Sequence, residues 1–414
     1  MMNKEFYKIT PFLNEIFGNK IELFPSVNEL FELELAFLEF KCLTKEQLLE
    51  RSAFIKSIDD KFSKHYLLYS DKIKILHENR SFQTQAYFEE GQYSTGYATH
   101  GLFPYRGKFH PQLIKGLINI LGVQKGETIL DPLSGSGTTN IEAALMGINS
   151  IAIDVSPFCQ LMIKTKYEAL TIDLQLLENS ILNTKKFFYF FSQGNALEKI
   201  NNIDSFEKKK IYNLALLAWL DALGYSKRVV KSNHEQLYDK VFPRYIETVK
   251  LILKNPYFNQ RNLGTLKILS DSEALKINLE KDTIDCVITS PPYSFAIDYV
   301  ENDKDQLEFL GYNTKELKNK FIGLKGKNKT ERLNNYFIDM DRVCSEVSRV
   351  LKKDKYFVII IGSNTNQTCG IRLEGEIINS AIKYNMPLIK SILKPIKGLR
   401  NIMKEEYVLI FKKQ

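Results

Sequence analysis

The chain has 414 residues, is 44% hydrophobic and 26% charged, and carries a formal net charge of +8. This composition is typical of a globular protein and excludes a largely disordered or collagen-like chain. No apolar run reaches the roughly 18 residues of a membrane-spanning helix, and the first residues lack the apolar core of a signal peptide. We therefore expect a cytoplasmic protein without a membrane segment.

Five cysteines are spread along the chain, and no two of them form a Cys-x-x-Cys pair: Cys42, Cys159, Cys286, Cys344 and Cys369. This spacing argues against a zinc module and against a disulfide framework, and it indicates a reducing compartment. We expect no metal site.

The charge is unevenly distributed. Residues 1–60 contain 7 basic and 11 acidic residues, a net charge of −4, so the other 354 residues carry +12. A positive balance of this size permits a nucleic-acid partner, but a solvated lysine-rich surface produces the same value.

Residues 1 to about 80 have a mixed, largely helical hydrophobic pattern, and we assign 1–95 to a helical N-terminal extension of unassigned role. Beyond it, short apolar strands alternate with helices. Helices are predicted over 112–121 and 140–146. Strands are predicted at 128–131, 150–153, 266–269, 286–289, 356–361 and 407–411.

This alternation predicts an α/β fold with a mostly parallel sheet that is covered by helices on both faces. Ligands of such sheets bind at the carboxyl ends of the strands. Residues 164–265 interrupt the alternation with a largely helical, polar sequence of 16 basic and 10 acidic residues, net +6. We expect a helical insertion between the second and third strands.

A glycine-rich loop, Asp131-Pro-Leu-Ser-Gly-Ser-Gly-Thr-Thr139, follows the first predicted strand. Its glycines allow close backbone approach to a ligand, and the free N–H groups of the next helix favour an anion. A phosphate-binding loop would have Lys-Ser/Thr after its last glycine, and a plain strand–helix turn is the other alternative. A ligand with an α-amino and an α-carboxyl group fits better. The candidate binding residues are Asp131, Pro132, Ser134, Gly135, Ser136, Gly137 and Thr138.

Two further strand ends carry acids. Asp154 follows the second strand, about twenty residues after the loop, where an acid accepts the two hydroxyls of a ribose. The alternative for Asp154 is a helix N-cap before Pro157. Asp271 and Ser272 follow the third strand and are candidates to bind an adenine amino group.

The fourth strand end, Thr289-Ser290-Pro291-Pro292-Tyr293, is the most specific. Two prolines fix the backbone and have no N–H, so the nearby carbonyls are left as acceptors. Ser290 adds an acceptor and Tyr293 a ring for stacking. This set suits a planar base with an exocyclic NH₂ group, whereas a structural Pro-Pro turn would need neither side chain.

Together these loops resemble those of the amino-group DNA methyltransferases that use S-adenosylmethionine. Asp131 to Gly137 resembles their methionine-binding motif, Asp154 their ribose-binding acid, and Asp271 their adenine-contacting position. Ser290 to Tyr293 resembles their catalytic motif. The resemblance covers about residues 95–165 and 263–414.

Two flanking segments strengthen the resemblance. Residues 103–111, FPYRGKFHP, resemble the segment that closes the cofactor pocket, which adds Lys108 and His110 as candidate cofactor residues. The alternative for His110 is an ordinary loop histidine. Residues 296–299, AIDY, resemble the continuation found in restriction-associated members.

The resemblance implies a Rossmann-like class I methyltransferase sheet, with 96–163 as its cofactor-binding half and 266–414 as its catalytic half. It implies S-adenosylmethionine as cofactor and direct methyl transfer to an exocyclic amine. The implied catalytic residues are Ser290, Pro291, Pro292 and Tyr293. Members with Ser before Pro-Pro-Tyr are mostly cytosine-N4 methylases, so Ser290 favours cytosine over adenine N6.

The implied partner is double-stranded DNA, with the target base flipped out and stacked on Tyr293. We expect the insertion to recognise the target, with the loop 322–327 as second choice. Candidate phosphate contacts are Lys227, Arg228, Lys231 and Arg244 in the insertion and Lys397 and Arg400 near the C-terminus. The alternative for each is a solvated surface charge.

Four other functions compete with this one. They are adenine-N6 methylation of DNA, guanine-N2 methylation of RNA, binding without catalysis, and a fused nuclease. The RNA enzymes usually carry an acid before Pro-Pro-Tyr, and the intact motifs argue against an inactive site. Residues 1–95 show no clear carboxylate–lysine cluster of a nuclease. The restriction-associated resemblance makes a separately encoded restriction endonuclease a candidate partner.

Overall fold

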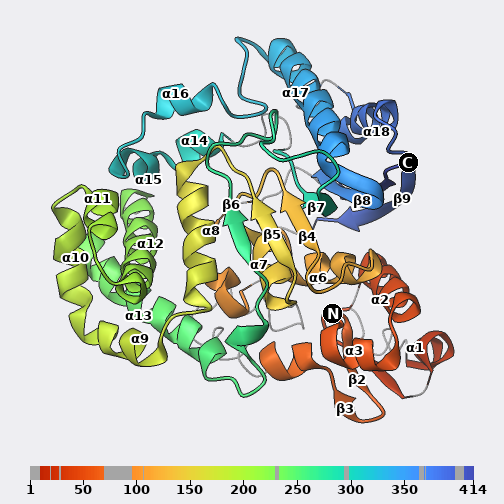
Figure 1. Ribbon diagram of the computed structural model, residues 1–414, viewed down its shortest axis with the longest axis horizontal. Coiled ribbons are helices and arrows are strands. Elements are labelled where there is room, and N and C mark those ends of the chain that lie inside the picture. The colour runs from red at the N-terminus through yellow and green to blue at the C-terminus, as the bar shows by residue number, and fades with distance from the viewer. Residues whose placement is uncertain are drawn as a thin grey trace, which may run out of the picture. The chain divides into compact units, whose positions relative to one another are not determined.

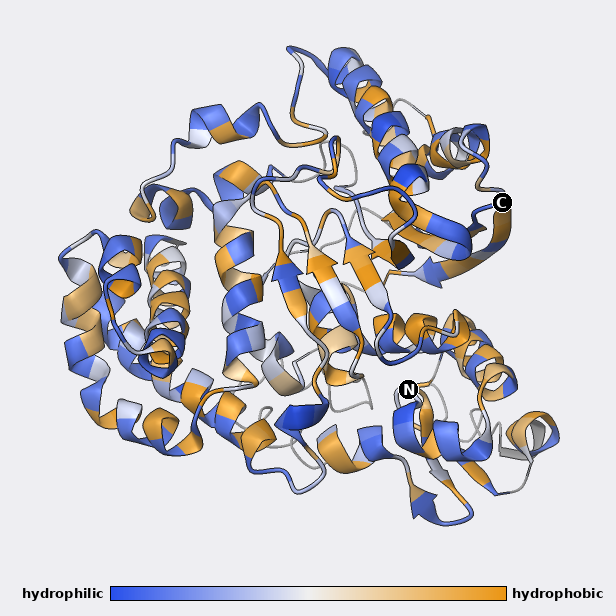
Figure 2. Cartoon of the chain, viewed as in Figure 1, coloured by the Kyte–Doolittle hydropathy of each residue, from blue (hydrophilic) through white to orange (hydrophobic). Residues whose placement is uncertain are grey.

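The apolar runs of the sequence lie side by side in one sheet, as the hydropathy colouring of the strands shows (Figure 2). The computed structural model describes residues 10–18, 20–27, 29–69, 96–105, 107–228, 233–292, 298–362, 368, 370–396 and 405–414. The chain divides into two units, which are described separately below.

The larger unit comprises Thr99–Lys108, Gln124–Leu253 and Gln260–Gln414 and contains a seven-stranded sheet (Figure 1). In the order of the sheet, its strands are β6 (Leu266–Ile268), β5 (Asn149–Ala152), β4 (Thr128–Asp131), β7 (Ile284–Thr289), β8 (Leu351–Gly362), β10 (Glu405–Lys412) and β9 (Leu388–Pro395). The first five strands pair in parallel, and β10 is antiparallel to both of its neighbours.

The strand order reverses at β4. The chain builds outward from β4 through β5 to β6 and then returns to place β7 on the other side of β4. In open α/β sheets, ligands bind beyond the carboxyl ends of the strands at such a switch point. The fold is therefore the predicted α/β class, and it brings the loops after β4 and β7 to the same edge of the sheet.

Helices cover the sheet. Those of the larger unit are α7 (Thr138–Leu145), α8 (Pro157–Ala169), α9 (Leu174–Ser180), η3 (Ile181–Asn183), α10 (Thr184–Ser192), α11 (Ala196–Asn201), α12 (Phe206–Arg228), α13 (His234–Leu253), η4 (Gln260–Asn262), α14 (Tyr299–Asn302), α15 (Lys304–Phe309), α16 (Thr314–Lys318), α17 (Lys329–Val350) and α18 (Leu373–Lys383). Val287, Ile359 and Leu409 face a core shared with α17 and α18. The alternate residues Ile288 and Val358 are equally buried on the opposite face.

The structure places only helices and their connections between β5 and β6, in the residues it describes there. α8, α10, α12 and α13 form a second apolar core, which also includes Leu307 of α15. Seven consecutive residues of α12, Leu214 to Leu220, are buried in it, among them Trp219.

The smaller unit comprises residues up to Ala98 together with Phe109–Val123 and Lys254–Asn259. Its elements are α1 (Thr10–Phe17), β1 (Ile21–Leu23), α2 (Leu30–Cys42), α3 (Lys45–Arg51), β2 (Ile55–Ile58), β3 (Lys61–Phe62) and α6 (Pro111–Ile120); η2 (Ala98–Gly101) lies at its boundary. The sequence predicted the helices but missed the antiparallel sheet β1-β2-β3. Asp59 and Asp60 form its two-residue turn, with φ angles of 47° and 62° that Asp tolerates better than most residues.

Across the portion of the chain that the structure describes, no helix is both long and apolar enough to cross a membrane.

Candidate active site

The buried carboxylate of Asp131 links the ends of β4 and β7. Its Oδ1 atom accepts hydrogen bonds from the Thr289 hydroxyl at 2.6 Å and from the Leu133 amide at 3.1 Å. Burial raises the pKa of Asp131 to about 6, although its interactions with Thr289, Leu133 and Thr139 oppose the rise. Because Thr289 immediately precedes Ser290, this bond holds the start of the predicted catalytic motif at the start of the glycine loop.

The two loop glycines serve different purposes. Gly135 and Gly137 have φ angles of 50° and 77°, which are strained for other residues. A Cβ atom on Gly137 would lie 2.7 Å from Cγ1 of Ile163 in α8, whereas one on Gly135 would lie 3.6 Å from Cε1 of Tyr105. Close packing of α8 therefore requires Gly137, a reason that the sequence did not reveal. At Gly135 the neighbouring ring stays at ordinary contact distance.

The other predicted loop residues, Pro132, Ser134, Ser136 and Thr138, are all buried. The Ser134 hydroxyl donates to the Asp131 carbonyl at 2.7 Å, and the hydroxyls of Ser136 and Thr138 lie 3.3 Å apart. These side chains therefore shape the loop from within. Part of the loop backbone is also paired internally, since the Ser134 N–H donates to the Ile153 carbonyl at 3.0 Å and the Gly137 N–H donates to the Ser134 carbonyl at 2.8 Å.

Asp154, after β5, is joined to the same loop. Its carboxylate accepts the backbone N–H groups of Gly135 and Ser156, both at 2.8 Å. Burial raises the pKa of Asp154 to about 7; the two N–H donors oppose the rise, and the charges of Asp131 and Asp303 add to it. The ribose-binding candidate thus lies directly against the glycine loop.

Three buried polar atoms at this loop have no hydrogen-bond partner among the residues described: Oδ2 of Asp131 and both amide atoms of Asn140 in the first turn of α7. Buried polar atoms are normally paired, so these three atoms, together at the predicted binding loop, are candidates to contact a ligand. A carboxylate oxygen and an amide suit the ammonium and carboxylate groups of an amino acid. The residues present therefore fit the methionine part of the predicted cofactor.

A buried lysine lies beneath the loop. Lys166 of α8 is 1% exposed and donates to the Ser136 carbonyl at 3.0 Å. Burial lowers its pKa well below the usual value, and the nearby charge of Lys108 lowers it further. Sequence reasoning missed Lys166 because nothing local distinguishes it from a surface lysine.

Lys108 itself, a predicted cofactor residue, is half-buried and donates to the His100 carbonyl at 2.7 Å. The His100 ring lies 2.8 Å from the carboxylate of Glu142, and both side chains are buried. Burial lowers the pKa of His100 to about 4, so the ring is neutral at neutral pH. His110 belongs to the smaller unit, where it precedes α6, and its part in cofactor binding stays a prediction.

Two tyrosines that sequence reasoning also missed lie next to this loop. The rings of Tyr105 and Tyr299 stack at 6.2 Å with an interplanar angle of 16°. Burial raises the pKa of the Tyr105 hydroxyl, and the charges of Asp303 and Asp154 add to the rise. The Cys159 thiol donates to the Tyr105 hydroxyl at 3.5 Å. The position of Tyr105 inside the FPYRGKFHP segment was the signal that could have identified it.

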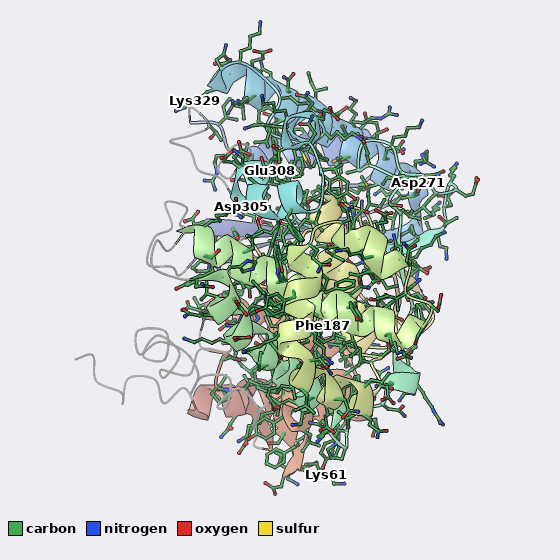
Figure 3. All side chains as sticks on the ribbon, turned by 90° about the vertical axis from the view of Figure 1, so that its left-hand side faces the viewer. Lys61, Phe187, Asp271, Asp305, Glu308 and Lys329 are labelled. Carbon is green, nitrogen blue, oxygen red and sulfur yellow. The ribbon has the colours of Figure 1, made fainter. Side chains whose placement is uncertain are left out.

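Asp271 is exposed and accepts a hydrogen bond from the Asn278 side chain at 3.0 Å (Figure 3). Its neighbour Ser272 is buried, and its hydroxyl accepts the Asn278 backbone N–H at 2.7 Å. These bonds fold the loop after β6 back on itself. An adenine contact from Asp271 stays a prediction.

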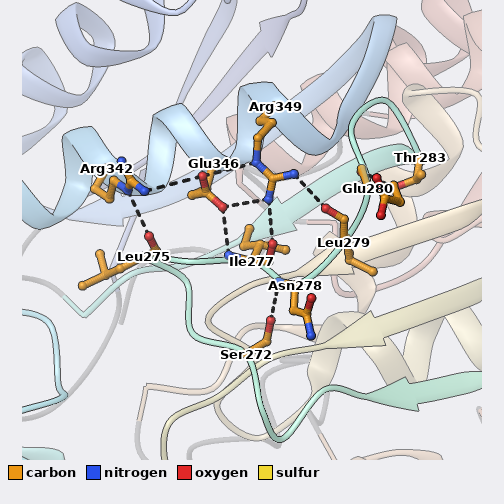
Figure 4. A network of polar contacts seen from close by, with 10 residues as sticks. All are labelled: Ser272, Leu275, Ile277, Asn278, Leu279, Glu280, Thr283, Arg342, Glu346 and Arg349. Atoms are coloured by element: carbon orange, nitrogen blue, oxygen red, sulfur yellow. Dashed lines mark hydrogen bonds and ion pairs between the residues drawn. The ribbon is translucent and has the colours of Figure 1, made fainter.

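The same loop is fastened to α17 (Figure 4). Glu346 accepts the Ile277 N–H at 2.9 Å, and Arg349 donates to the carbonyls of Ile277 and Leu279. Burial alone would raise the pKa of Glu346, but its bonds to Arg349 and Ile277 outweigh that effect and lower it. A charged pair on one helix therefore fixes the loop that carries Asp271.

At the end of β7, Ser290 and Pro292 are partly exposed and Pro291 is buried. Tyr293 lies outside the described residues. Cys286 is buried in β7, and burial raises the pKa of its thiol, so a nucleophilic thiolate at this strand is disfavoured.

The predicted phosphate contacts are only partly described. Lys227 is exposed near the end of α12, and Arg244 pairs with Asp221 at 3.1 Å while staying about half exposed. The Arg228 side chain and the residues Lys231, Lys397 and Arg400 lie outside the described part of the chain.

Two family models match the chain. One, described as an RMKL-like methyltransferase domain, matches residues 102–307, and the other, described as a DNA methylase, matches residues 284–414. Their overlap contains the Ser290-Pro-Pro motif, and together they span both predicted halves of the sheet.

Curated relatives agree with these matches. The chain is 24% identical to the Type II methyltransferase M.BsoBI of Geobacillus stearothermophilus, over 72% of this chain and 68% of that protein. It is 22% identical to the Type II methyltransferase M.MvaI of Kocuria varians, over 73% and 85%. A stretch of 53 residues is 42% identical to a tRNA (guanine(10)-N2)-dimethyltransferase of Methanothermobacter thermautotrophicus, over 13% of this chain and 16% of that protein.

Proposed function

Because the chain belongs to the amino-group DNA methyltransferase family, we propose that it transfers a methyl group from S-adenosylmethionine to the N4 amine of cytosine in duplex DNA. The bond between Thr289 and Asp131 carries this proposal. It joins the motif that suits an exocyclic amine to the loop that suits an amino acid. Reacting groups held at one edge gain rate from orientation alone.

The exocyclic amine is a poor nucleophile because its lone pair is delocalised into the base. The enzyme must therefore make this lone pair available for methyl transfer. In the proposal, Ser290 Oγ and the carbonyls of Ser290 and Pro291 accept hydrogen bonds from the NH₂ group. These acceptors favour a tetrahedral nitrogen whose lone pair points at the methyl group. The nitrogen–carbon bond forms as the carbon–sulfur bond breaks, and the amine then loses a proton to solvent. No enzyme nucleophile is required, which agrees with the buried Cys286.

The cofactor supplies an activated methyl group. In our assignment, Asp131 faces its ammonium, and the N–H groups at the start of α7, together with Asn140, face its carboxylate. Asp154 accepts its ribose hydroxyls, and Asp271 contacts its adenine. Tyr105 closes the site beside Gly135.

The target base must leave the duplex to reach Ser290, because bases are inaccessible inside the helix. Tyr293 then offers a ring on which the base stacks. Since M.BsoBI and M.MvaI are named Type II methyltransferases, we propose that this enzyme protects host DNA in a restriction–modification system with a separately encoded endonuclease.

Two alternatives remain within the same chemistry. Adenine N6 presents the same kind of amine, and only the preference of Ser-Pro-Pro-Tyr enzymes for cytosine argues against it. The 53-residue match to a tRNA guanine-N2 enzyme favours an RNA amine as the second candidate. Its short extent, against more than 300 residues for M.BsoBI, makes DNA the first choice.

The test is expression in a host that lacks DNA methylation, followed by sequencing that reads modified bases and their sequence context. We expect N4-methylcytosine in one short motif. N6-methyladenine would overturn the cytosine assignment, and transfer to RNA with unmodified DNA would overturn the DNA substrate.

The S290A variant tests the catalytic assignment. We expect it to lose at least 100-fold in methyl transfer, the size of effect seen when a group that stabilises a transition state is removed, while it still binds the cofactor. S348A is the matched control, because Ser348 in α17 bonds the Tyr384 carbonyl far along the chain from the motif. Full activity in S290A would refute the role of Ser290.

A further inference from the structure

A segment that starts twenty residues after Tyr293 is strongly basic. Residues 313–332 contain 7 basic and 2 acidic residues, a net charge of +5 in 20 residues, whereas the insertion 164–265 spreads +6 over about a hundred. The segment includes α16 and lies beyond the carboxyl ends of the parallel strands (Figure 1). Its charge density is therefore several times that of the insertion.

Three lysines of this segment form ion pairs with residues outside it. Lys318 pairs with Asp298, just after the catalytic loop. Lys320 pairs with Glu273 at 3.4 Å, in the loop that carries Asp271. A third pair, Lys325 with Asp339 at 3.1 Å, fixes the segment to α17. Ion pairs therefore connect the segment to the chain just after the catalytic loop and to the loop that carries Asp271.

Three other lysines of the segment face solvent. Lys315, Lys327 and Lys329 are exposed, and no ion pair is found for them among the described residues. Lys329 is the first residue of α17 (Figure 3). The turn before it is fixed, because Arg332 donates to the Gly326 carbonyl at 3.1 Å. An ordered loop with free cations is suited to phosphates.

Some cations of the insertion are already paired, although others, such as Lys185, Lys186 and Lys240, are exposed. Arg244 pairs with Asp221, and the buried Lys210 pairs with Glu207 at 2.7 Å. In the sequence, residues 298–308 lie between the insertion and the basic segment, and they contain five acidic residues and one basic residue. Glu301 and Glu308 of this stretch are exposed (Glu308 in Figure 3). Glu301 is partly offset by Lys304 at 3.9 Å. Exposed acids repel phosphates, so this stretch disfavours a duplex that crosses it.

We propose that residues 313–332 form the surface that contacts DNA phosphates beside the flipped base, and that the helical insertion is mainly a scaffold for α8. This inference rests on the proposed DNA substrate. It reverses the expectation that the insertion is the first site of DNA contact.

Two triple variants of the full chain test the proposal. K315A/K327A/K329A removes the free cations of the segment. K185A/K186A/K240A removes the same charge from exposed positions of the insertion. Binding to a labelled 30-base-pair duplex of arbitrary sequence is measured by fluorescence anisotropy from about 50 to 200 mM salt, the range in which phosphate contacts dominate affinity.

We expect the segment variant to bind the duplex at least tenfold more weakly than wild type. The slope of log affinity against log salt concentration should become shallower by up to about 2.7, since each lost phosphate contact removes roughly 0.9. The insertion variant should stay within about twofold of wild type. Both variants should bind S-adenosylmethionine as wild type does, which shows that they are folded. Equal losses in both variants, or a loss in the insertion variant alone, would overturn the inference. Wild-type protein that neither binds nor methylates DNA would refute the proposed function itself.

Discussion

The hydroxyl of Thr289 donates to the buried carboxylate of Asp131 at 2.6 Å and thereby joins the ends of β7 and β4. The two residues are 158 positions apart in the sequence, yet each begins one of the two motifs on which the function depends. The bond also leaves Oδ2 of Asp131 as the open acceptor. One hydrogen bond therefore orients a carboxylate and sets the relative position of two loops.

Replacing Thr289 by Val should cost about 1–3 kcal/mol of unfolding free energy, because a buried acceptor loses its donor while the side-chain shape is kept. Cofactor affinity should fall as well, since the pKa of Asp131 would rise further and its carboxylate would be less often charged. Urea unfolding and calorimetric titration with S-adenosylmethionine measure the two effects. T283V is the control, because the Thr283 hydroxyl donates to the Glu280 carbonyl at an exposed turn. Unchanged cofactor affinity in T289V would contradict this role of the bond.

Cofactor binding should weaken at low pH. The pKa of Asp154 is raised to about 7 in the free protein, and only the carboxylate can accept both ribose hydroxyls. Below that pKa the carboxyl must lose a proton on binding, so affinity should fall up to tenfold per pH unit and be constant well above pH 7. Calorimetric titration at several pH values measures this profile. D154N should bind weakly at every pH with a flatter profile, and stronger binding at acid pH in the wild type would contradict the assignment.

Lys166→Met should separate stability from binding. Burial disfavours the charged form of the Lys166 amine, so replacing it by an apolar chain of similar length should leave stability unchanged or raise it. The Ser136 carbonyl loses its donor, so the loop is less well held, and we expect roughly tenfold weaker cofactor binding, equivalent to about 1.4 kcal/mol. Thermal unfolding and calorimetry are the measurements. K164M, at a half-exposed position of the same helix, should change neither, and a parallel loss of stability and affinity in K166M would indicate a purely structural lysine.

The two loop glycines should respond differently to alanine. G137A forces a Cβ atom to within 2.7 Å of Ile163, so we expect it to unfold at clearly lower urea concentration than wild type. G135A meets only Tyr105 at 3.6 Å and should lose less stability, mainly from its positive φ. Its cofactor affinity should nevertheless fall. If G135A were the less stable variant, the packing explanation for Gly137 would be wrong.

The sequence was most informative where a motif is local. The loops after β4 and β7 could be predicted because their glycines and prolines constrain the backbone over a few residues. The strand β9 was missed because only Ile392 is buried at this edge of the sheet, so its polar and apolar residues show little pattern. The sequence could have predicted the two-residue turn at Asp59 and Asp60, but two aspartates indicate a hairpin less strongly than Asn-Gly does.

The partners within the site could not be predicted in the same way. Thr289 and Lys166 matter through residues that are far apart in the sequence, and only the sheet order and the packing of α8 bring them to Asp131 and Ser136. Counting charges favoured the insertion because its net charge of +6 can be obtained from the sequence alone. It did not show that Arg244 is already paired with Asp221. Pairing is a property of tertiary structure, so composition alone overestimates the cations available to a ligand.

The single tryptophan of the chain gives this molecule a built-in optical probe. Trp219 lies in α12 with its ring 3.9 Å from that of Phe309 in α15 and 4.3 Å from that of His234. Its emission therefore reports on the junction between the insertion and the helices that follow the catalytic loop. Burial lowers the pKa of His234, so the ring is largely uncharged at neutral pH and quenching by its protonated form is minor there. A spectral shift on adding cofactor or duplex would reveal whether this junction opens during the reaction cycle, without any label.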